Sequence, residues 1–173
     1  MLKNLKIYRG KSTVKFKCTN GDLYDSSSEL YDESGKLIDS SQYVNTDSTV
    51  SYHGGKLKAG NYYAIAGLRP VAYQSQPIRV LKLFKLLPGQ KIEGVKSEAN
   101  IYPMMWVLPS AIANPNHNGE FIIELVQCHP GSESWDWSHG CQTWLNFGGY
   151  TEFDKLINLI ADKEVITIEL IEE

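Results

Sequence analysis

A thiol and two imidazoles lie close together in the sequence, within residues 127–143. Cys141 ends the four-residue box SHGC, and His129 lies twelve residues before it. A cysteine becomes a good nucleophile when a nearby base or positive charge stabilises its thiolate, and an imidazole is the usual base. This short segment therefore contains the minimum set of groups for acyl transfer through a cysteine.

The order of these residues suggests a role for each. We interpret His129 as the general base that takes the thiol proton and later returns it to the leaving amine. In an extended segment His139 would share a face with Cys141, so it is either a competing base or a supporting group. Gly140 permits a tight turn, at which the backbone N–H groups of Gly140 and Cys141 can hold an oxyanion. Structural alternatives stay open, because cysteines are often packed in the core and loop histidines are often at the surface.

Other side chains of the segment have two interpretations each. The tryptophans either belong to the core or line a groove for a sugar or peptide chain, because indole offers a flat apolar face. They are Trp135, Trp137 and Trp144. Cys128 is predicted to be a packed thiol. A disulfide between Cys128 and Cys141 stays open as an alternative, and it would block the proposed chemistry.

Composition restricts the class of protein. The chain has 173 residues, 42% of them hydrophobic and 21% charged, which suits one soluble globular domain. Its net charge of −3 gives no reason to expect nucleic acid or an anionic membrane as a partner. Three cysteines with no CxxC pair exclude a fully paired disulfide framework and argue against a zinc site. We therefore expect no metal and no cofactor, and the oligomeric state is left open.

Targeting signals are also absent from the sequence as it stands. No stretch approaches the roughly 20 apolar residues of a membrane span, so no membrane span is expected. The first residues contain no apolar run of signal-peptide length. The expectation is synthesis in the cytosol, with release to the cell wall by another route, as for a bacteriophage or effector protein.

The first fifty residues are typical of short strands joined by polar turns. Strands are expected at 6–8 and 13–18. Residues 28–31 and 36–38 flank the sequence DESG, which predicts a hairpin with its glycine at a position of positive φ. Residues 39–41 (DSS) are predicted to form a polar loop.

The middle of the chain combines apolar strands with a loop-rich stretch. NYYAIA at 61–66 predicts a buried strand. IRVLKLFKLL at 78–87 fits neither period cleanly, and its proline and glycine boundaries favour a strand. Residues 95–118 contain three prolines and are predicted to be a loop that forms a lid or wall. FIIELV at 121–126 is predicted to be the strand that presents His129.

The end of the chain has the clearest pattern. Thr151 is a predicted N-cap, followed by acidic residues and an apolar stripe at i, i+3, i+4 and i+7, which predicts a helix over 151–162. VITIELI at 165–171 alternates as a strand does. The prediction is a mainly β single domain over 1–173, with an N-terminal β-hairpin region at 1–50 and one helix before the last strand.

Residues 54–173 resemble the catalytic domain of the L,D-transpeptidases of the YkuD type. That family carries an upstream histidine followed by a Ser/Thr-His-Gly-Cys box. The resemblance rests on SHGC at 138–141, on the strand before His129 and on the closing helix and strand, with LKAGNYYAI at 57–65 similar to an early strand of the family. It implies a β-sandwich or barrel core with an active-site groove.

The resemblance also implies a reaction. Cys141 would attack a carbonyl of a peptidoglycan stem peptide and form a thioester, with His129 as the base. Transfer to an amine would make a cross-link, and transfer to water would be hydrolysis. The substrate would be bound near the cysteine by Ser138, Trp137 and Thr143.

Two features depart from the family pattern. Thr143 stands where the family usually has Arg or Asn, and the gap between histidine and cysteine is shorter than usual. Two other functions therefore stay open. One is a non-catalytic virion or cell-wall-binding module that retains the fold, and the other is a cysteine amidase acting on a different peptide.

Overall fold

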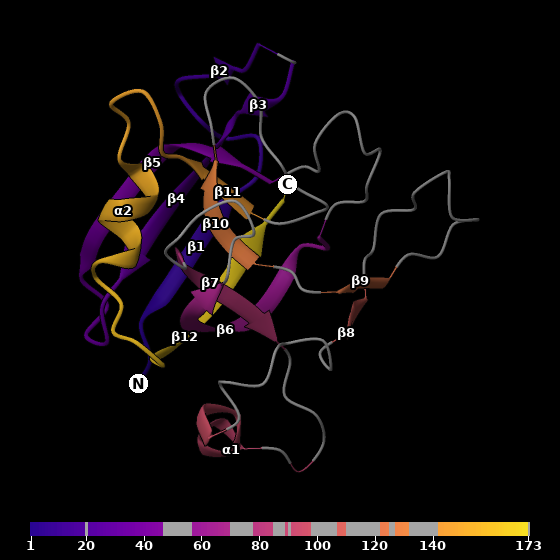
Figure 1. The fold of residues 1–173 in the computed structure, drawn as a ribbon, viewed down its shortest axis with the longest axis vertical. Coiled ribbons are helices and arrows are strands. Elements are labelled where there is room, and N and C mark those ends of the chain that lie inside the picture. The colour runs from indigo at the N-terminus through magenta and orange to yellow at the C-terminus, as the bar shows by residue number, and fades with distance from the viewer. Residues whose placement is uncertain are drawn as a thin grey trace.

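Eight strands close into a barrel, which makes up the body of the molecule (Figure 1). The computed structural model describes residues 1–19, 21–46, 57–69, 78–84, 89, 91–97, 107–109, 122–124, 127–131 and 142–172. Neighbouring strands around the barrel follow the order β1-β12-β6-β7-β10-β11-β5-β4. Their bounds are β1 Asn4–Tyr8, β4 Ser26–Tyr31, β5 Leu37–Asn45, β6 Gly60–Arg69, β7 Ile78–Phe84, β10 Gln127–Gly131, β11 Gln142–Leu145 and β12 Val165–Ile171. The prediction of a mainly β class is confirmed.

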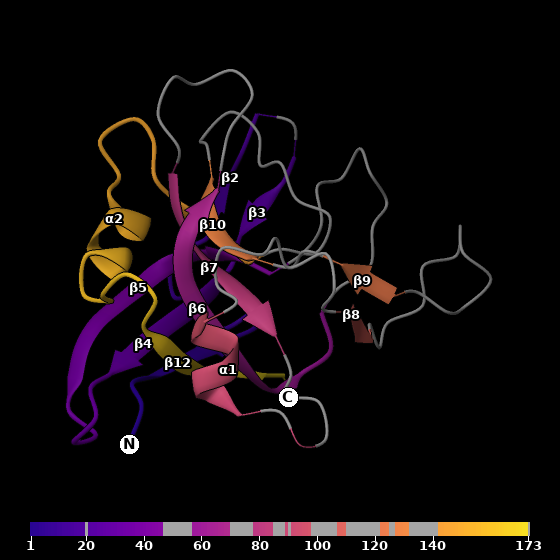
Figure 2. The same cartoon turned by 60° about the horizontal axis from the view of Figure 1, so that its bottom comes forward.

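Two short strand pairs and two short helices surround the barrel. They are β2 Phe16–Lys17 with β3 Leu23–Tyr24, β8 Val107–Pro109 with β9 Ile122–Glu124, α1 Ile92–Ser97 and α2 Glu152–Ile157. The pair β8–β9 lies on the side of the barrel opposite α2, and Figure 2 shows α1 in front of the barrel. Neither described helix is long and apolar enough to cross a membrane.

Two of the barrel's strand pairs are parallel, and the other six are antiparallel. β1 runs parallel to β12, and β10 runs parallel to β11 with Cys128 paired to Gln142. Parallel neighbours cannot be joined by a tight turn, so a longer connection must carry the chain back to the start of the partner strand. Between β10 and β11 that connection is residues 132–141, which includes most of the predicted catalytic segment.

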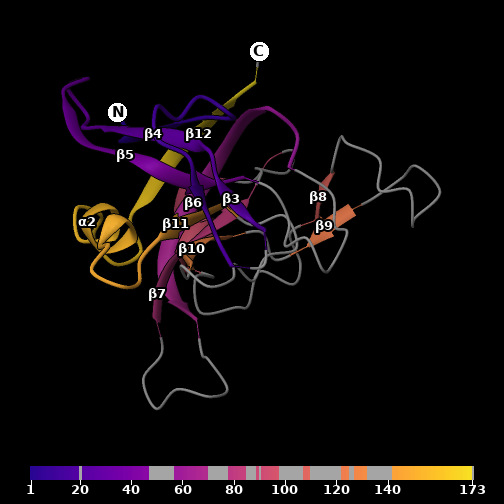
Figure 3. The ribbon, with the colours of Figure 1, turned by 90° about the horizontal axis from the view of Figure 1, so that it is seen from above.

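The barrel interior is filled by the inward-facing side chain of every second residue, as strand geometry requires. Trp144 is fully buried there, and its indole N–H donates to the Ser28 hydroxyl at 3.0 Å. Its ring centroid lies 6.0 Å from that of Phe153 of α2, so the apolar stripe of the helix joins the same core. Figure 3 shows α2 packed beside the barrel wall.

The predicted helix over 151–162 is correct in place and too long. α2 ends at Ile157, and single turns with i→i+3 bonds follow it. Thr151 occupies the N-cap position, but its side chain makes no capping hydrogen bond. Instead, the backbone N–H of Asp154 donates to the Asn146 side-chain oxygen at 3.1 Å. An amide from the preceding loop therefore provides the cap that was assigned to Thr151.

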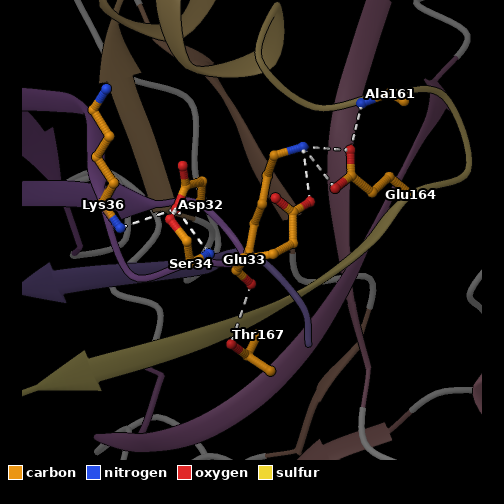
Figure 4. Close-up of polar contacts among 8 residues, drawn as sticks. Asp32, Glu33, Ser34, Lys36, Ala161, Glu164 and Thr167 are labelled. Atoms are coloured by element: carbon orange, nitrogen blue, oxygen red, sulfur yellow. Dashed lines mark hydrogen bonds and ion pairs between the residues drawn. The ribbon is translucent and has the colours of Figure 1, made fainter.

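The predicted hairpin between β4 and β5 is confirmed. Asp32 Oδ1 accepts the backbone N–H groups of Ser34 and Lys36, both at 2.9 Å (Figure 4). The Ser34 side chain, followed by the Lys36 N–H, holds the pKa of Asp32 below its usual value. Gly35 has a φ of 86°, as the turn requires. The polar loop predicted at 39–41 is wrong, because these residues continue β5.

An ion pair joins the beginnings of two parallel strands. The Lys3 ammonium, just before β1, lies 2.9 Å from Glu164 Oε2, just before β12. Glu164 Oε1 also accepts the backbone N–H of Ala161 at 2.8 Å (Figure 4). The same carboxylate therefore holds the turn after α2 and the first strand of the chain.

Three other predicted elements differ from the structure. The strand predicted at 13–18 is reduced to β2. The strand predicted at 121–126 is β9, which pairs with β8 outside the barrel, whereas His129 lies within the separate strand β10. Inside the predicted loop 95–118, the described residues include the end of α1 and the strand β8. The strand predicted at 61–66 is confirmed as part of β6, and that predicted at 78–87 is confirmed as β7 over residues 78–84, with residues 85–87 outside the described part of the chain.

Candidate functional site

His129 lies on the outer face of the barrel, in the middle of β10. Its neighbour Cys128 is fully buried in the barrel core, as predicted for a packed thiol. Because side chains alternate along a strand, His129 points away from that core. The histidine is nevertheless only 7% exposed. It is therefore a buried polar side chain outside the barrel interior.

Two more buried polar residues lie beside His129 in the sheet. Thr143 of β11 pairs with His129, and Asn45 of β5 pairs with Thr143. Residues paired in register point to the same face. Thr143 is 0% exposed and Asn45 is 1% exposed. The imidazole, the hydroxyl and the amide thus form one line across three strands.

A second pair extends this surface to β7. Gln127 lies two residues before His129 on β10 and pairs with Lys82 of β7. Both side chains face outward, because their neighbours Cys128 and Leu81 belong to the barrel core. Gln127 is 3% exposed and Lys82 is 6% exposed. We call the five outward residues the polar row: Asn45, Thr143, His129, Gln127 and Lys82.

Burial makes the polar row a candidate site. Removing amide, hydroxyl, imidazole and ammonium groups from water is unfavourable unless they are hydrogen-bonded or paired. Each member of the polar row does take part in at least one interaction in the structure. We take this concentration of buried polar groups around His129 as the candidate site.

The backbone sets the tautomer of His129. Its ring Nδ1 lies 2.8 Å from the carbonyl oxygen of Pro130. A carbonyl oxygen can only accept, so Nδ1 carries the hydrogen in this contact. In the neutral ring, the lone pair is then on Nε2. The imidazole is oriented as a base whose reactive nitrogen is Nε2.

Lys82 is the charged member of the polar row. Burial lowers the pKa of its ammonium below the usual 10.5. Its side chain lies across β6, where a Cβ added to Gly67 would be 3.6 Å from both Nζ and Cε. The absence of a side chain at Gly67 leaves room for the lysine to lie along the sheet.

Two of the predicted site residues are brought together in the structure, and the others lie outside the described residues. His129 and Thr143 are paired neighbours on one face. The remaining predicted residues cannot be placed: Trp137, Ser138, His139, Gly140 and Cys141. Trp144 belongs to the core, so of its two interpretations, a core residue or a residue lining a groove, the first is correct. Trp135 also lies outside the described residues.

Three members of the polar row were missed by the sequence analysis. Lys82 had a signal, since it is a charged residue at the centre of the apolar run IRVLKLF. Gln127 and Asn45 had none, because an amide at the end of a strand is ordinary at a solvent-exposed edge. Among the described residues, no group of three or more His, Cys, Asp or Glu side chains is arranged to hold a metal ion.

No protein-family model, no curated protein and no solved structure matches this chain.

Proposed function

We propose that this protein performs cysteine-dependent acyl transfer, with Cys141 as the nucleophile and His129 as its base. The observation that carries the proposal is the parallel register of β10 and β11, which sets Thr143 beside His129. Cys141 is two residues before Thr143 and is joined by a peptide bond to Gln142, the first residue of β11. That bond holds the Cα atoms of residues 141 and 142 about 3.8 Å apart. The proposal therefore requires the thiol of Cys141, which precedes β11 directly in the sequence, to reach the edge of the polar row.

The orientation of His129 supports the direction of proton transfer. The hydrogen bond from Nδ1 to the Pro130 carbonyl leaves Nε2 to accept the thiol proton. The thiolate then attacks the substrate carbonyl carbon and forms a tetrahedral oxyanion. Collapse of this intermediate breaks the C–N bond, forms the thioester and passes the proton from Nε2 to the leaving amine. An amine or water then attacks the thioester and regenerates the thiol.

The resemblance of the SHGC box to that of the L,D-transpeptidases supplies the substrate class and the finer fold assignment. We propose a peptidoglycan stem peptide as the acyl donor. In this proposal the N–H groups of Gly140 and Cys141 hold the oxyanion. Thr143 is the predicted substrate-binding residue that the structure sets beside the base.

Product analysis tests the proposal directly. The protein is incubated with purified muropeptides, and both the products and the intact protein mass are followed by mass spectrometry. We expect a new muropeptide product and a transient thioester adduct on the wild type. The variant Cys141→Ala should lose both, and His129→Gln should slow turnover about 10²- to 10⁴-fold.

Buried thiols provide a matched control. Cys18 and Cys128 are 3% and 0% exposed, so neither should form the adduct. Peptide mapping of the trapped protein locates the modification. Turnover that survives Cys141→Ala would overturn the proposal, as would the lack of both product and adduct in the wild type. Biological activity that persists in that variant would support a non-catalytic binding module.

A further inference from the structure

Two carboxylates lie where the start of α2 packs against β5. Ser41 of β5 donates its hydroxyl hydrogen to Glu152 Oε1 of α2 at 2.8 Å, and Asp39 lies two residues before Ser41 on the same strand. Asp39 pairs with Leu30 of β4, which is fully buried in the barrel core. Paired residues point to the same face, so Asp39 and Ser41 both face the covered side of β5. We call Asp39 and Glu152 the carboxylate pair.

The two members of the carboxylate pair differ in their partners. Both oxygens of Glu152 are engaged, because Oε1 accepts from Ser41 and Oε2 lies 2.8 Å from the Lys155 ammonium. Asp39 Oδ2 is buried and has no hydrogen-bond partner among the described residues. A charged oxygen that has lost its water and gained no donor is unfavourable. A proton on this oxygen removes the charge, so the fold favours the protonated form of Asp39.

The charges around Asp39 have the same net effect. Burial raises the pKa of the Asp39 carboxyl above its usual value; the Lys155 ammonium opposes this shift, and the Glu152 carboxylate adds to it. Two further acids of the same elements point elsewhere. Glu29 of β4 alternates with buried neighbours and so lies on the opposite face, and Asp154 of α2 is exposed. Glu152 is therefore the acid whose charge disfavours ionised Asp39.

We propose that α2 is held to β5 by a proton-sensitive contact, in which Asp39 takes up a proton from the solvent as the pH falls and the helix then packs more firmly. This inference does not depend on the proposed function. Because the pKa of Asp39 is raised, the folded protein binds this proton more readily than the unfolded chain does. The stabilisation therefore begins as the pH falls through the folded pKa, and it is complete below the ordinary value of 3.8.

Amide exchange followed by NMR tests the proposal at the helix itself. The backbone N–H groups of Lys155 and Asn158 donate to carbonyl oxygens one turn earlier in the chain, at 3.0 and 3.1 Å, so their protection factors report on α2. The variant is Asp39→Asn, which has nearly the shape of the protonated acid and no charge. At pH 7 we expect it to raise both protection factors about 2- to 5-fold, the size typical of a partly solvated charge interaction. The gain should shrink as the pH falls toward 3.8, because the wild type then becomes protonated itself.

Two matched controls identify the cause. Asp162→Asn removes an exposed carboxylate just after α2, and it should leave both protection factors unchanged. Arg79 of β7 donates to the Ile160 carbonyl at 2.7 Å. Arg79→Gln should lower protection equally at every pH tested, because a guanidinium does not titrate. A gain in Asp39→Asn that is the same at every pH would mean that the amide acts through packing, and it would overturn the proposal. Protection that is unchanged or lower in this variant at pH 7 would also overturn it.

A titration of the wild-type protein measures the proton directly. The carboxyl ¹³C shift of Asp39 follows its ionisation, and the Asp39→Asn variant identifies the resonance. We expect a midpoint above 3.8, and the protection factors of α2 should rise as the pH falls through the same midpoint. A midpoint at or below 3.8 would contradict the proposal.

Discussion

The side chain of Arg9 offers a sharp test of what holds the barrel closed. Its guanidinium follows β1 and donates from Nε to the Thr46 hydroxyl at 2.9 Å and from Nη2 to the Leu57 carbonyl at 2.8 Å. It also lies 2.7 Å from a carboxylate oxygen of Glu172. One side chain therefore joins the ends of β1 and β5, the segment before β6 and the end of β12.

The two kinds of contact should differ in strength. Thr46 and Leu57 are 1% and 0% exposed, so losing Arg9 removes one buried hydrogen bond from each. Hydrogen bonds to a charged group contribute about 1.5–3 kcal/mol each, which gives about 3–6 kcal/mol for Arg9→Met. The Glu172 side chain is 41% exposed, so its ion pair is screened and contributes about 0–1 kcal/mol. The free energy of unfolding of a single domain is about 5–15 kcal/mol, so the loss expected for Arg9→Met is a large part of the total.

Urea titration followed by circular dichroism measures both effects. Arg9→Met should lower the free energy of unfolding by about 3–6 kcal/mol, and Glu172→Gln by less than about 1 kcal/mol. Arg9→Lys should fall between them, because an ammonium keeps the charge and loses the planar fork. If Glu172→Gln costs as much as Arg9→Met, the ion pair dominates and the reasoning from burial is wrong.

Three further predictions concern stability. Burial lowers the pKa of Lys82, so just below pH 10.5 the unfolded chain binds more protons than the folded protein. Lys82→Met should therefore raise Tm at pH 7. Thermal unfolding at several pH values should show the Tm difference between variant and wild type narrowing toward pH 10.5, because the cost of the buried charge disappears there. Burial, followed by Glu29, raises the pKa of Tyr8 from 10.0 to about 12, so its contribution is complete below pH 10 and is lost as the pH rises toward 12. Tyr8→Phe should remove the last step of a phenolate absorbance titration and reduce the alkaline loss of stability. Trp144→Phe should lower the free energy of unfolding by about 2–4 kcal/mol in urea titrations, because it leaves a cavity and strands the Ser28 hydroxyl.

Elements with local signals were predictable from the sequence. The hairpin after β4 depends on Asp32 and Gly35, which act on their own turn. β7 was ambiguous in period because both of its faces are buried, with Val80 and Leu81 each 0% exposed. A strand covered on both sides loses the alternation by which strands are recognised.

Elements that depend on distant contacts were not predictable. Residues 39–41 are polar and look like a loop, yet they continue β5. Ser41 donates to Glu152 of α2 at 2.8 Å, and Asp39 is partly buried near the same helix. Likewise, nothing near Lys82 or Asn45 in the sequence shows that the outer face of their strands is buried. Such positions require the tertiary partner to be known.

The largest core residue also decides which side chains of β11 face outward. Trp144 is 0% exposed and bonded to Ser28 inside the barrel, so Thr143 must face outward beside His129. The proposed role of Cys141 requires its thiol to reach this same outer face, where His129 lies. A register shift of one residue would instead turn Thr143 toward the core and Trp144 outward. The fit of one indole in the barrel therefore selects the register that sets Thr143 beside His129.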